Sequence, residues 1–396
     1  MKVPTRRFGR TGLAMPVYSC GGMRFQHAWD DKPAADIPPD SDRQVEACVR
    51  RALDLGIRHI ETARGYGTSE LQLGRVLPGL PRGEMIVQTK VAPAPTAAKF
   101  REDFETSMRH LRLDHVDLLA LHGINNAELL DQSIAPGGCL DEALRLRDEG
   151  RVRFIGFSSH GPVPVLIGAI DTGAFDYINL HWYYVNRINT PVLPAARAHD
   201  MGVFIISPSD KGGKLYEPSA RLVELCRPLT PIAFNNLWCL NHEEVHTLSI
   251  GAARPSDFDA HVEALAHWDE RGKWLPLIES RLRGRIAEVF GDDWVDGWFA
   301  GLPEHDRVPG GVNVREILRL WTYAQAFDML AFARMRYNLL GQAGHWFPGL
   351  NAAGVDDEGV RRACRASPYA DRIPGLLREA HALLFTEPLQ RLGKSP

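Results

Sequence analysis

The feature that most constrains the fold is a strand–helix pattern that repeats from residue 17 onward. Eight short runs rich in Val, Ile, Leu or aromatic residues alternate with helical stretches, at residues 17–21, 59–63, 85–91, 116–122, 154–159, 177–183, 203–209 and 246–252. Runs that are apolar on both faces are typical of strands in a parallel sheet covered by helices. The alternation predicts parallel strands joined by right-handed crossovers.

Eight such units within about 250 residues indicate an α/β fold, a (β/α)₈ TIM barrel. The alternative is an open, doubly wound sheet, which is weakened because no GxGxxG motif follows the first strand. The repeat stops near residue 270. We therefore expect a barrel domain over residues 1–285 and a helical C-terminal extension over residues 286–396, with a long amphipathic stretch at 314–340.

Composition excludes several classes of function. The chain has 396 residues, and its 46 Lys and Arg against 49 Asp and Glu leave no basic surplus for nucleic acid. No apolar run approaches the roughly 20 residues needed to cross a bilayer, and the N-terminus lacks the apolar region of a signal peptide. The six cysteines form no CxxC pair, as is typical of reduced thiols. We expect a cytoplasmic protein with neither a nucleic-acid nor a membrane partner; its oligomeric state stays open.

Polar side chains stand where functional groups of a barrel lie, at the carboxyl ends of the strands. Lys90 ends an apolar run, and a buried lysine needs a negative partner such as Glu61 on the neighbouring strand. A cation beside Tyr66 would lower the pKa of its phenol and make it a proton donor, while His122 would hold a carbonyl oxygen. Each residue alone also fits a structural role, and Lys90 a Schiff base; their combination on consecutive strands indicates catalysis.

The stretch GIRHIETARGYGTSELQLGRVL (56–77) resembles the signature of the aldo-keto reductases. Four further segments are similar to that family: RRFGRTGLAMPVYSCGGMRF (6–25), MIVQTK (85–90), VDLLALHG (116–123) and RFIGFSSH (153–160). The resemblance implies a reductase of a small-molecule carbonyl, with Glu61, Tyr66, Lys90 and His122 as its catalytic tetrad. The family usually has Asp where this chain has Glu61, so the longer side chain must fold back to reach Lys90.

The same resemblance implies a nicotinamide cofactor across the barrel mouth, NADP(H) in the first place and NAD(H) as the alternative. The residues expected to bind it are Gly22, Met23, Ser158, Asn179, Ser207, Lys211, Gly251 and Arg254. Arg254 would fork onto a ribose 2′-phosphate and favour NADP(H), although a solvated loop arginine is the other interpretation. The family often stacks an aromatic ring on the nicotinamide from the seventh strand, where this chain has Ile206.

The predictions for the substrate site and for the C-terminal extension depend on fewer residues. Phe25, Trp29 and Trp182 are candidates for an apolar substrate wall, and loop 24–40 for a lid. In the extension, residues 302–318 and 363–377 resemble remnants of a ferredoxin-like tail that a subgroup of the family carries. Only Cys364 remains there, whereas a four-iron cluster needs about four thiolates, so we expect no iron–sulfur cluster.

Two functions follow from these residues. The first is a cytoplasmic, NADP(H)-dependent aldo-keto reductase. The alternative is a nucleotide-binding regulatory barrel with little turnover, which Glu61 and Ile206 leave open.

Overall fold

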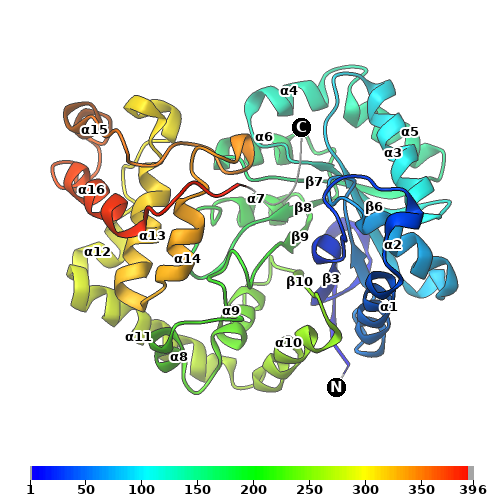
Figure 1. Ribbon diagram of the computed structural model, residues 1–396, viewed down its shortest axis with the longest axis horizontal. Helices are drawn as coiled ribbons and strands as arrows, with labels where there is room; N and C mark the ends of the chain where they lie inside the picture. Colours follow the sequence, from blue (N-terminus) through cyan, green and yellow to red (C-terminus); the bar gives the residue numbers. More distant parts are fainter. Residues whose placement is uncertain (1, 391–396) are drawn as a thin grey trace. The chain divides into compact units, whose positions relative to one another are not determined.

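A computed structural model describes residues 2–390 of the chain. Eight parallel strands close into a barrel in the order β10-β3-β4-β5-β6-β7-β8-β9 (Figure 1). They are β3 (Tyr18–Gly21), β4 (His59–Glu61), β5 (Ile86–Val91), β6 (Val116–His122), β7 (Val152–Ser158), β8 (Tyr177–Leu180), β9 (Gly202–Ile205) and β10 (Thr247–Gly251). The TIM barrel is thus confirmed. An open sheet is excluded because the last strand, β10, pairs with the first, β3.

Helices follow the strands and cover the outer face of the barrel. In chain order they are α1 (Pro39–Asp54), α2 (Ser69–Val76), α3 (Ala97–Leu111), α4 (Ala127–Ile134), α5 (Cys139–Asp148), α6 (Val163–Asp171), α7 (Val192–Ala198), α9 (Pro231–Leu240) and α10 (Asp259–Ala264). The helix α8 (Ala220–Cys226) belongs to the second unit described below. Local chemistry sets their ends. Thr96 caps α3 by accepting a hydrogen bond from Lys99 N at 3.2 Å, and α1 begins with Pro39, whose fixed φ suits a first helical turn.

An N-terminal hairpin supplies apolar side chains to one end of the barrel core. Its strands β1 (Thr5–Arg7) and β2 (Ala14–Pro16) are antiparallel. Phe8 and Met15, both fully buried, pack in one cluster with inward-facing residues of the barrel, namely Leu118, Ala120, Tyr177 and Phe204. Gly202 is required beside Phe8, because a Cβ there would lie 2.6 Å from the phenyl ring. This packing leaves the carboxyl ends of the strands as the end of the barrel open to a site.

The chain divides into two compact units. The first contains residues 2–208 and 236–266 and holds the barrel; the second contains residues 209–235 and 267–390. The domain boundary expected at residue 285 stays a prediction. Among the described residues, no helix combines the length and the apolar character needed to cross a membrane.

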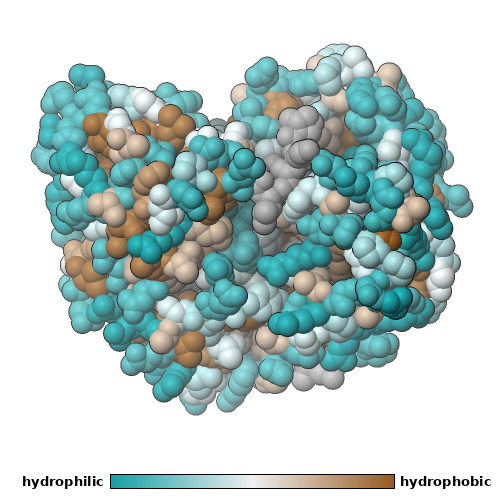
Figure 2. Space-filling model, viewed as in Figure 1, coloured by the Kyte–Doolittle hydropathy of each residue, from teal (hydrophilic) through white to brown (hydrophobic). Residues whose placement is uncertain are grey.

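The second unit is helical and has its own aromatic core. Besides α8 it contains α11 (Arg271–Phe290), α12 (Asp292–Gly297), α13 (Val314–Phe327), α14 (Leu330–Tyr337), α15 (Asp357–Ala363) and α16 (Ile373–Leu384). Trp294 lies 5.4 Å from Phe290 and 4.7 Å from Tyr369, measured between ring centroids. Asp328, with φ 56°, ends α13, so the stretch expected at 314–340 is two helices. Figure 2 shows hydrophobic side chains gathered over α13 and α14.

Candidate active site

Three of the four predicted catalytic residues are in direct contact at the barrel mouth. Lys90 Nζ donates to Glu61 Oε1, to Thr62 O at 2.8 Å and to Tyr66 Oη at 3.2 Å. Three acceptors match the three protons of an ammonium group. The Tyr66 hydroxyl also lies 3.4 Å from Glu61 Oε1, so phenol, ammonium and carboxylate form one closed group.

The ends of two neighbouring strands build this group. Glu61 ends β4 and Lys90 lies near the end of β5, which pairs with it. The chain continues beside β5 beyond Glu61, because Arg64 N donates to Lys90 O at 2.8 Å. A turn closed by Tyr66 N and Ala63 O, 3.0 Å apart, then brings the Tyr66 ring to 4.5 Å from Lys90 Nζ.

Because Lys90 and Glu61 are buried, the charge of each must be balanced by the other. Lys90 is 1% and Glu61 2% exposed. Burial lowers the pKa of Lys90 well below the usual range of a lysine, because the ammonium has left water. The Glu61 carboxylate supplies the opposite charge that keeps an ammonium here. The Glu61 side chain is one methylene longer than that of Asp, and its carboxylate still reaches Lys90.

His122 completes the predicted tetrad. It ends β6, is 8% exposed, and its ring stands edge-on to Tyr66 with 5.7 Å between centroids. Each of the four side chains thus contacts at least one of the others. Their catalytic roles stay predictions.

Ser158 and Asn179 form a row with His122 across three adjacent strands. His122 pairs in register with Ser158, and Ser158 pairs with Asn179. Ser158 Oγ accepts a hydrogen bond from Gly123 N at 3.0 Å. Asn179 Nδ2 is buried and makes no hydrogen bond within the described residues. A buried amide donor without a partner is costly, so this atom suits a polar group of a ligand such as a nicotinamide carboxamide.

The glycines expected to approach the cofactor lie at the ends of β3 and β10. Gly22 packs tightly, because a Cβ there would lie 2.7 Å from Glu61 O, and the next residue, Met23, is 36% exposed. Gly251 has more room: a Cβ there would meet only the Arg24 side chain, at 3.6 Å. Arg24 thus brings a positive charge to this strand end, which the sequence analysis did not single out.

The remaining residues that are expected to bind the cofactor lie on loops after β9 and β10. Ser207, in the first unit, adopts a left-handed backbone with φ 54°, whereas Lys211 belongs to the second unit. Ile206 follows β9 as expected, without a ring. Arg254 is exposed, and its Nε donates to Asp257 Oδ1 at 2.9 Å, so Asp257 orients the guanidinium. The contacts of these residues with the phosphate groups of the cofactor therefore stay predictions.

The three substrate-wall candidates lie in different surroundings. The Trp29 backbone lies against Gly67, next to Tyr66; a Cβ on Gly67, whose φ is +55°, would be 2.7 Å from Trp29 Cα. Phe25 is 3% exposed beneath Gly22. Trp182 is 1% exposed and stacks on Trp238, 4.4 Å between centroids, and its place in a substrate wall stays a prediction.

Two histidines at the strand ends were not singled out from the sequence. His160 follows Ser158 by two residues and His181 follows Asn179 by two, and their Nε2 atoms lie 3.1 Å apart. The signal was their matching spacing, two residues after Ser158 and two after Asn179, just beyond the ends of β7 and β8.

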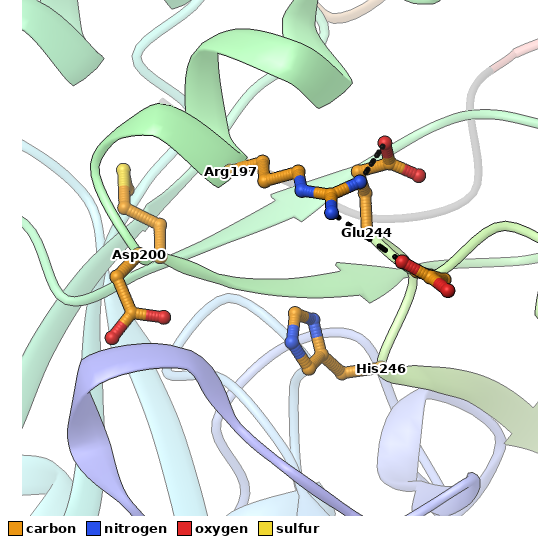
Figure 3. Close-up of a pocket in the computed structure, with 6 residues that line it drawn as sticks. Arg197, Asp200, Glu244 and His246 are labelled. Carbon is orange, nitrogen blue, oxygen red and sulfur yellow. Dashed lines mark hydrogen bonds and ion pairs between the residues drawn. The ribbon is translucent and has the colours of Figure 1, made fainter.

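A separate pocket lies at the opposite end of β9 and β10, where the strands begin. Arg197 lies 3.4 Å from Glu244 Oε1, and Figure 3 shows it pointing toward Glu244. Asp200 pairs with Arg7 at 2.6 Å, and His246 Nδ1 accepts from Val203 N at 3.0 Å. Burial lowers the pKa of His246 to about 4, with Arg6 and Arg7 contributing. Because these side chains form ion pairs or hydrogen bonds with neighbouring protein groups, we assign the pocket a structural role.

A closed eight-stranded barrel with a Lys–Glu–Tyr–His group at its mouth defines the class, and the family follows from comparison with known proteins. The sequence profile of the Aldo/keto reductase family matches residues 19–222, more than half of the chain. The chain belongs to this family.

Curated relatives and solved structures agree with that assignment. L-galactose dehydrogenase of Arabidopsis thaliana is 26% identical over 303 residues, covering 68% of this chain and 91% of that protein. D-threo-aldose 1-dehydrogenase of a Pseudomonas species is 26% identical over 328 residues, covering 68% and 95%. A holo-form aldo-keto reductase of Bacillus halodurans (TM-score 0.57, 20% identity, 70% and 96% covered) and one of Klebsiella pneumoniae in complex with NADPH (0.53, 22%, 69% and 96%) share the fold.

Proposed function

We propose that this protein is an NADP(H)-dependent oxidoreductase that interconverts a small-molecule carbonyl compound and the corresponding alcohol, with hydroxylated aldehydes and aldoses as the first substrates to examine. The observation that carries this proposal is the contact of the Tyr66 hydroxyl with Lys90 and Glu61. The names of the two curated relatives, both sugar dehydrogenases, support the substrate class. The NADPH-bound Klebsiella protein supports the cofactor.

The chain offers groups that suit a nicotinamide cofactor. When bound, the cofactor supplies or accepts a hydride at C4 of its nicotinamide ring. Asn179 Nδ2 and the Ser158 hydroxyl would hydrogen-bond the carboxamide, because both lie in the row with His122. Gly22, Met23, Gly251 and the loop with Ser207 and Lys211 would line the rest of the cofactor.

The tetrad would move one proton. As the carbonyl oxygen gains negative charge, Tyr66 transfers its hydroxyl proton to that oxygen and is left as a phenolate. The Lys90 ammonium, 3.2 Å from the phenol oxygen, stabilises the phenolate, and Glu61 holds Lys90 charged in its buried position. His122 would orient the carbonyl oxygen by a hydrogen bond. In the oxidation direction Tyr66 accepts the proton of the alcohol.

The alternative, a regulatory nucleotide-binding barrel with little turnover, now rests on Ile206 alone. The reach of Glu61 to Lys90 removes the other reason for it.

Turnover decides between the two functions. NADPH and NADH consumption should be followed with aldehydes, ketones and quinones, and the reverse reaction with aldoses. We expect NADPH-dependent reduction of at least one aldehyde. Cofactor binding without turnover across the panel would favour the regulatory barrel.

We expect Arg254→Ala to weaken NADPH binding while leaving NADH binding nearly unchanged. A guanidinium pairs strongly with the 2′-phosphate that only NADPH carries, so about tenfold weaker NADPH binding is expected, which corresponds to about 1.4 kcal/mol. Calorimetry with both cofactors measures this, and Arg271→Ala, at an arginine of the second unit, is the control. Equal affinities of the wild type for both cofactors would refute the assignment.

For the rest of the chain we propose that residues 286–396 are a degenerate ferredoxin-like extension that binds no cluster. The support is Cys364, the only cysteine in that range, which is fully buried. We also propose a cytoplasmic location. The oligomeric state is left open.

A further inference from the structure

The interior of the barrel contains a set of buried polar side chains, where TIM barrels usually have branched aliphatic ones. Five such residues have no exposed surface: Thr247 of β10, Ser19 of β3, His59 of β4, Gln88 of β5 and Asn179 of β8. Ser19 Oγ lies 2.6 Å from His59 Nδ1 and 2.7 Å from Thr247 Oγ1. Because polar groups are costly to bury, such a set indicates that its members hold one another, or a ligand, in place.

One contact of this set crosses the barrel. Gln88 Nε2 donates to Asn179 Oδ1 at 3.4 Å. The strands β6 and β7 lie between β5 and β8 in the sheet, so this bond passes through the barrel interior. Gln88 also precedes Lys90 by two residues on the same face of β5, and it pairs in register with Glu61. Gln88 therefore connects the strands of the Lys90–Glu61 pair with the expected nicotinamide site.

On the side of β4, Gln88 borders a neutral imidazole. Burial, with the Lys90 charge contributing, lowers the pKa of His59 to about 3, so its ring is uncharged. The Gln88 side chain opposes this shift, which shows that the two side chains are neighbours. Gln88 thus lies between His59, which Ser19 contacts, and Asn179.

The bond to Gln88 determines what Asn179 offers a ligand. An asparagine amide is planar, with an acceptor at Oδ1 and two donor protons at Nδ2. Because Oδ1 accepts from Gln88, rotation of the amide is restricted and Nδ2 is the atom left for a ligand. Nδ2 is buried and makes no hydrogen bond within the described residues. A donor held in this way suits a carbonyl oxygen, which only accepts.

We propose that Gln88 is a positioning residue that orients the Asn179 amide, so that Nδ2 donates to the carbonyl oxygen of the nicotinamide carboxamide. This inference rests on the proposed function, which assigns the carboxamide to Ser158 and Asn179. Gln88 acts only through Asn179, by one hydrogen bond. Removal of either partner of that bond should therefore have the same consequence for cofactor recognition.

The test compares NADP⁺ with its thionicotinamide analogue, in which sulfur, a weak acceptor, replaces the carboxamide oxygen. The ratio of the two dissociation constants, measured by calorimetry, reports the bond to that oxygen and cancels the contacts of the rest of the cofactor. One hydrogen bond contributes a net factor of about 3 to 10. Gln88→Met, a side chain of similar length without a donor, should lower the preference for NADP⁺ by that factor.

A double-variant cycle separates positioning from general disruption. Asn179→Leu alone should lower the preference at least as much as Gln88→Met. In the Asn179→Leu background, Gln88→Met should change it no further, because both variants remove the same bond. Gln88→Asn keeps an amide but is one methylene shorter, so it should also lower the preference; it provides the readout if Gln88→Met does not fold. Gln342→Met, at an exposed glutamine of the second unit, is the control and should leave the preference unchanged.

The outcomes distinguish this inference from the proposed function. A preference that stays constant across Gln88→Met and Gln88→Asn, or that Gln88→Met lowers equally in the Asn179→Leu background, overturns the role of Gln88 and leaves the reductase standing. If the wild type binds neither NADP⁺ nor NAD⁺, the proposed function is contradicted, and this inference falls with it.

Discussion

Tyr66→Phe should lower the rate of carbonyl reduction by about 10²–10⁴-fold, the usual contribution of a positioned general acid. The change removes only the hydroxyl that lies 3.2 Å from Lys90 Nζ and 3.4 Å from Glu61 Oε1. The ring still packs edge-on against His122, so folding and NADPH affinity should persist. Single-turnover kinetics with NADPH, together with cofactor titration, measure both quantities.

Tyr216→Phe is the matched control, because Tyr216 lies in the second unit and is 36% exposed. It should retain the wild-type rate. If Tyr66→Phe also retained it, the proton would have to come from another group, with His122 as the next candidate.

Lys90→Met should reduce activity by a similar factor and also destabilise the fold. Without the ammonium, the phenolate of Tyr66 loses the cation that stabilises it. Glu61, 2% exposed, would be left as an uncompensated buried charge, which typically costs about 3–5 kcal/mol. Chemical denaturation gives the free energy of unfolding, and NADPH consumption gives the rate.

The double variant Lys90→Met/Glu61→Gln separates the two effects. Replacing the carboxylate by a neutral amide should recover much of the stability, whereas activity should stay low because the cation is still missing. Recovery of activity along with stability would mean that Lys90 acts only through the fold.

The barrel, and the gathering of the four candidate catalytic side chains at its mouth, could be predicted because each depends on local chain pattern. The apolar runs are long enough to register as covered strands, and parallel strands in a barrel bring their carboxyl ends to one face. Glu61, Lys90 and His122 were therefore expected at the same end of the barrel once the strands were assigned. Whether the longer Glu61 reaches Lys90 depends on the conformation of its side chain, which the sequence does not reveal.

Other features depend on contacts or backbone angles that no short pattern reveals. The strands β1 (TRR) and β2 (AMP) lack the apolar runs from which the barrel strands were predicted, although their hairpin contributes to the barrel core. The break between α13 and α14 falls at Asp328, a non-glycine residue in the left-handed region. Trp182 and His181 directly follow β8, and their side chains have different neighbours: Trp182 stacks on Trp238, whereas His181 packs against His160. The sequence analysis chose the tryptophan and passed over the histidine.

The central claim is that this barrel transfers hydride between a nicotinamide and a carbonyl carbon, and isotope transfer tests it most directly. The wild-type protein is incubated with an aldehyde and NADPH carrying deuterium at C4 of the nicotinamide, and the alcohol is analysed by mass spectrometry and NMR. The account predicts one deuterium on the carbinol carbon, and its formation should slow by about 10²–10⁴-fold in Tyr66→Phe. NADPH consumption without labelled alcohol, or cofactor binding without consumption, would contradict it.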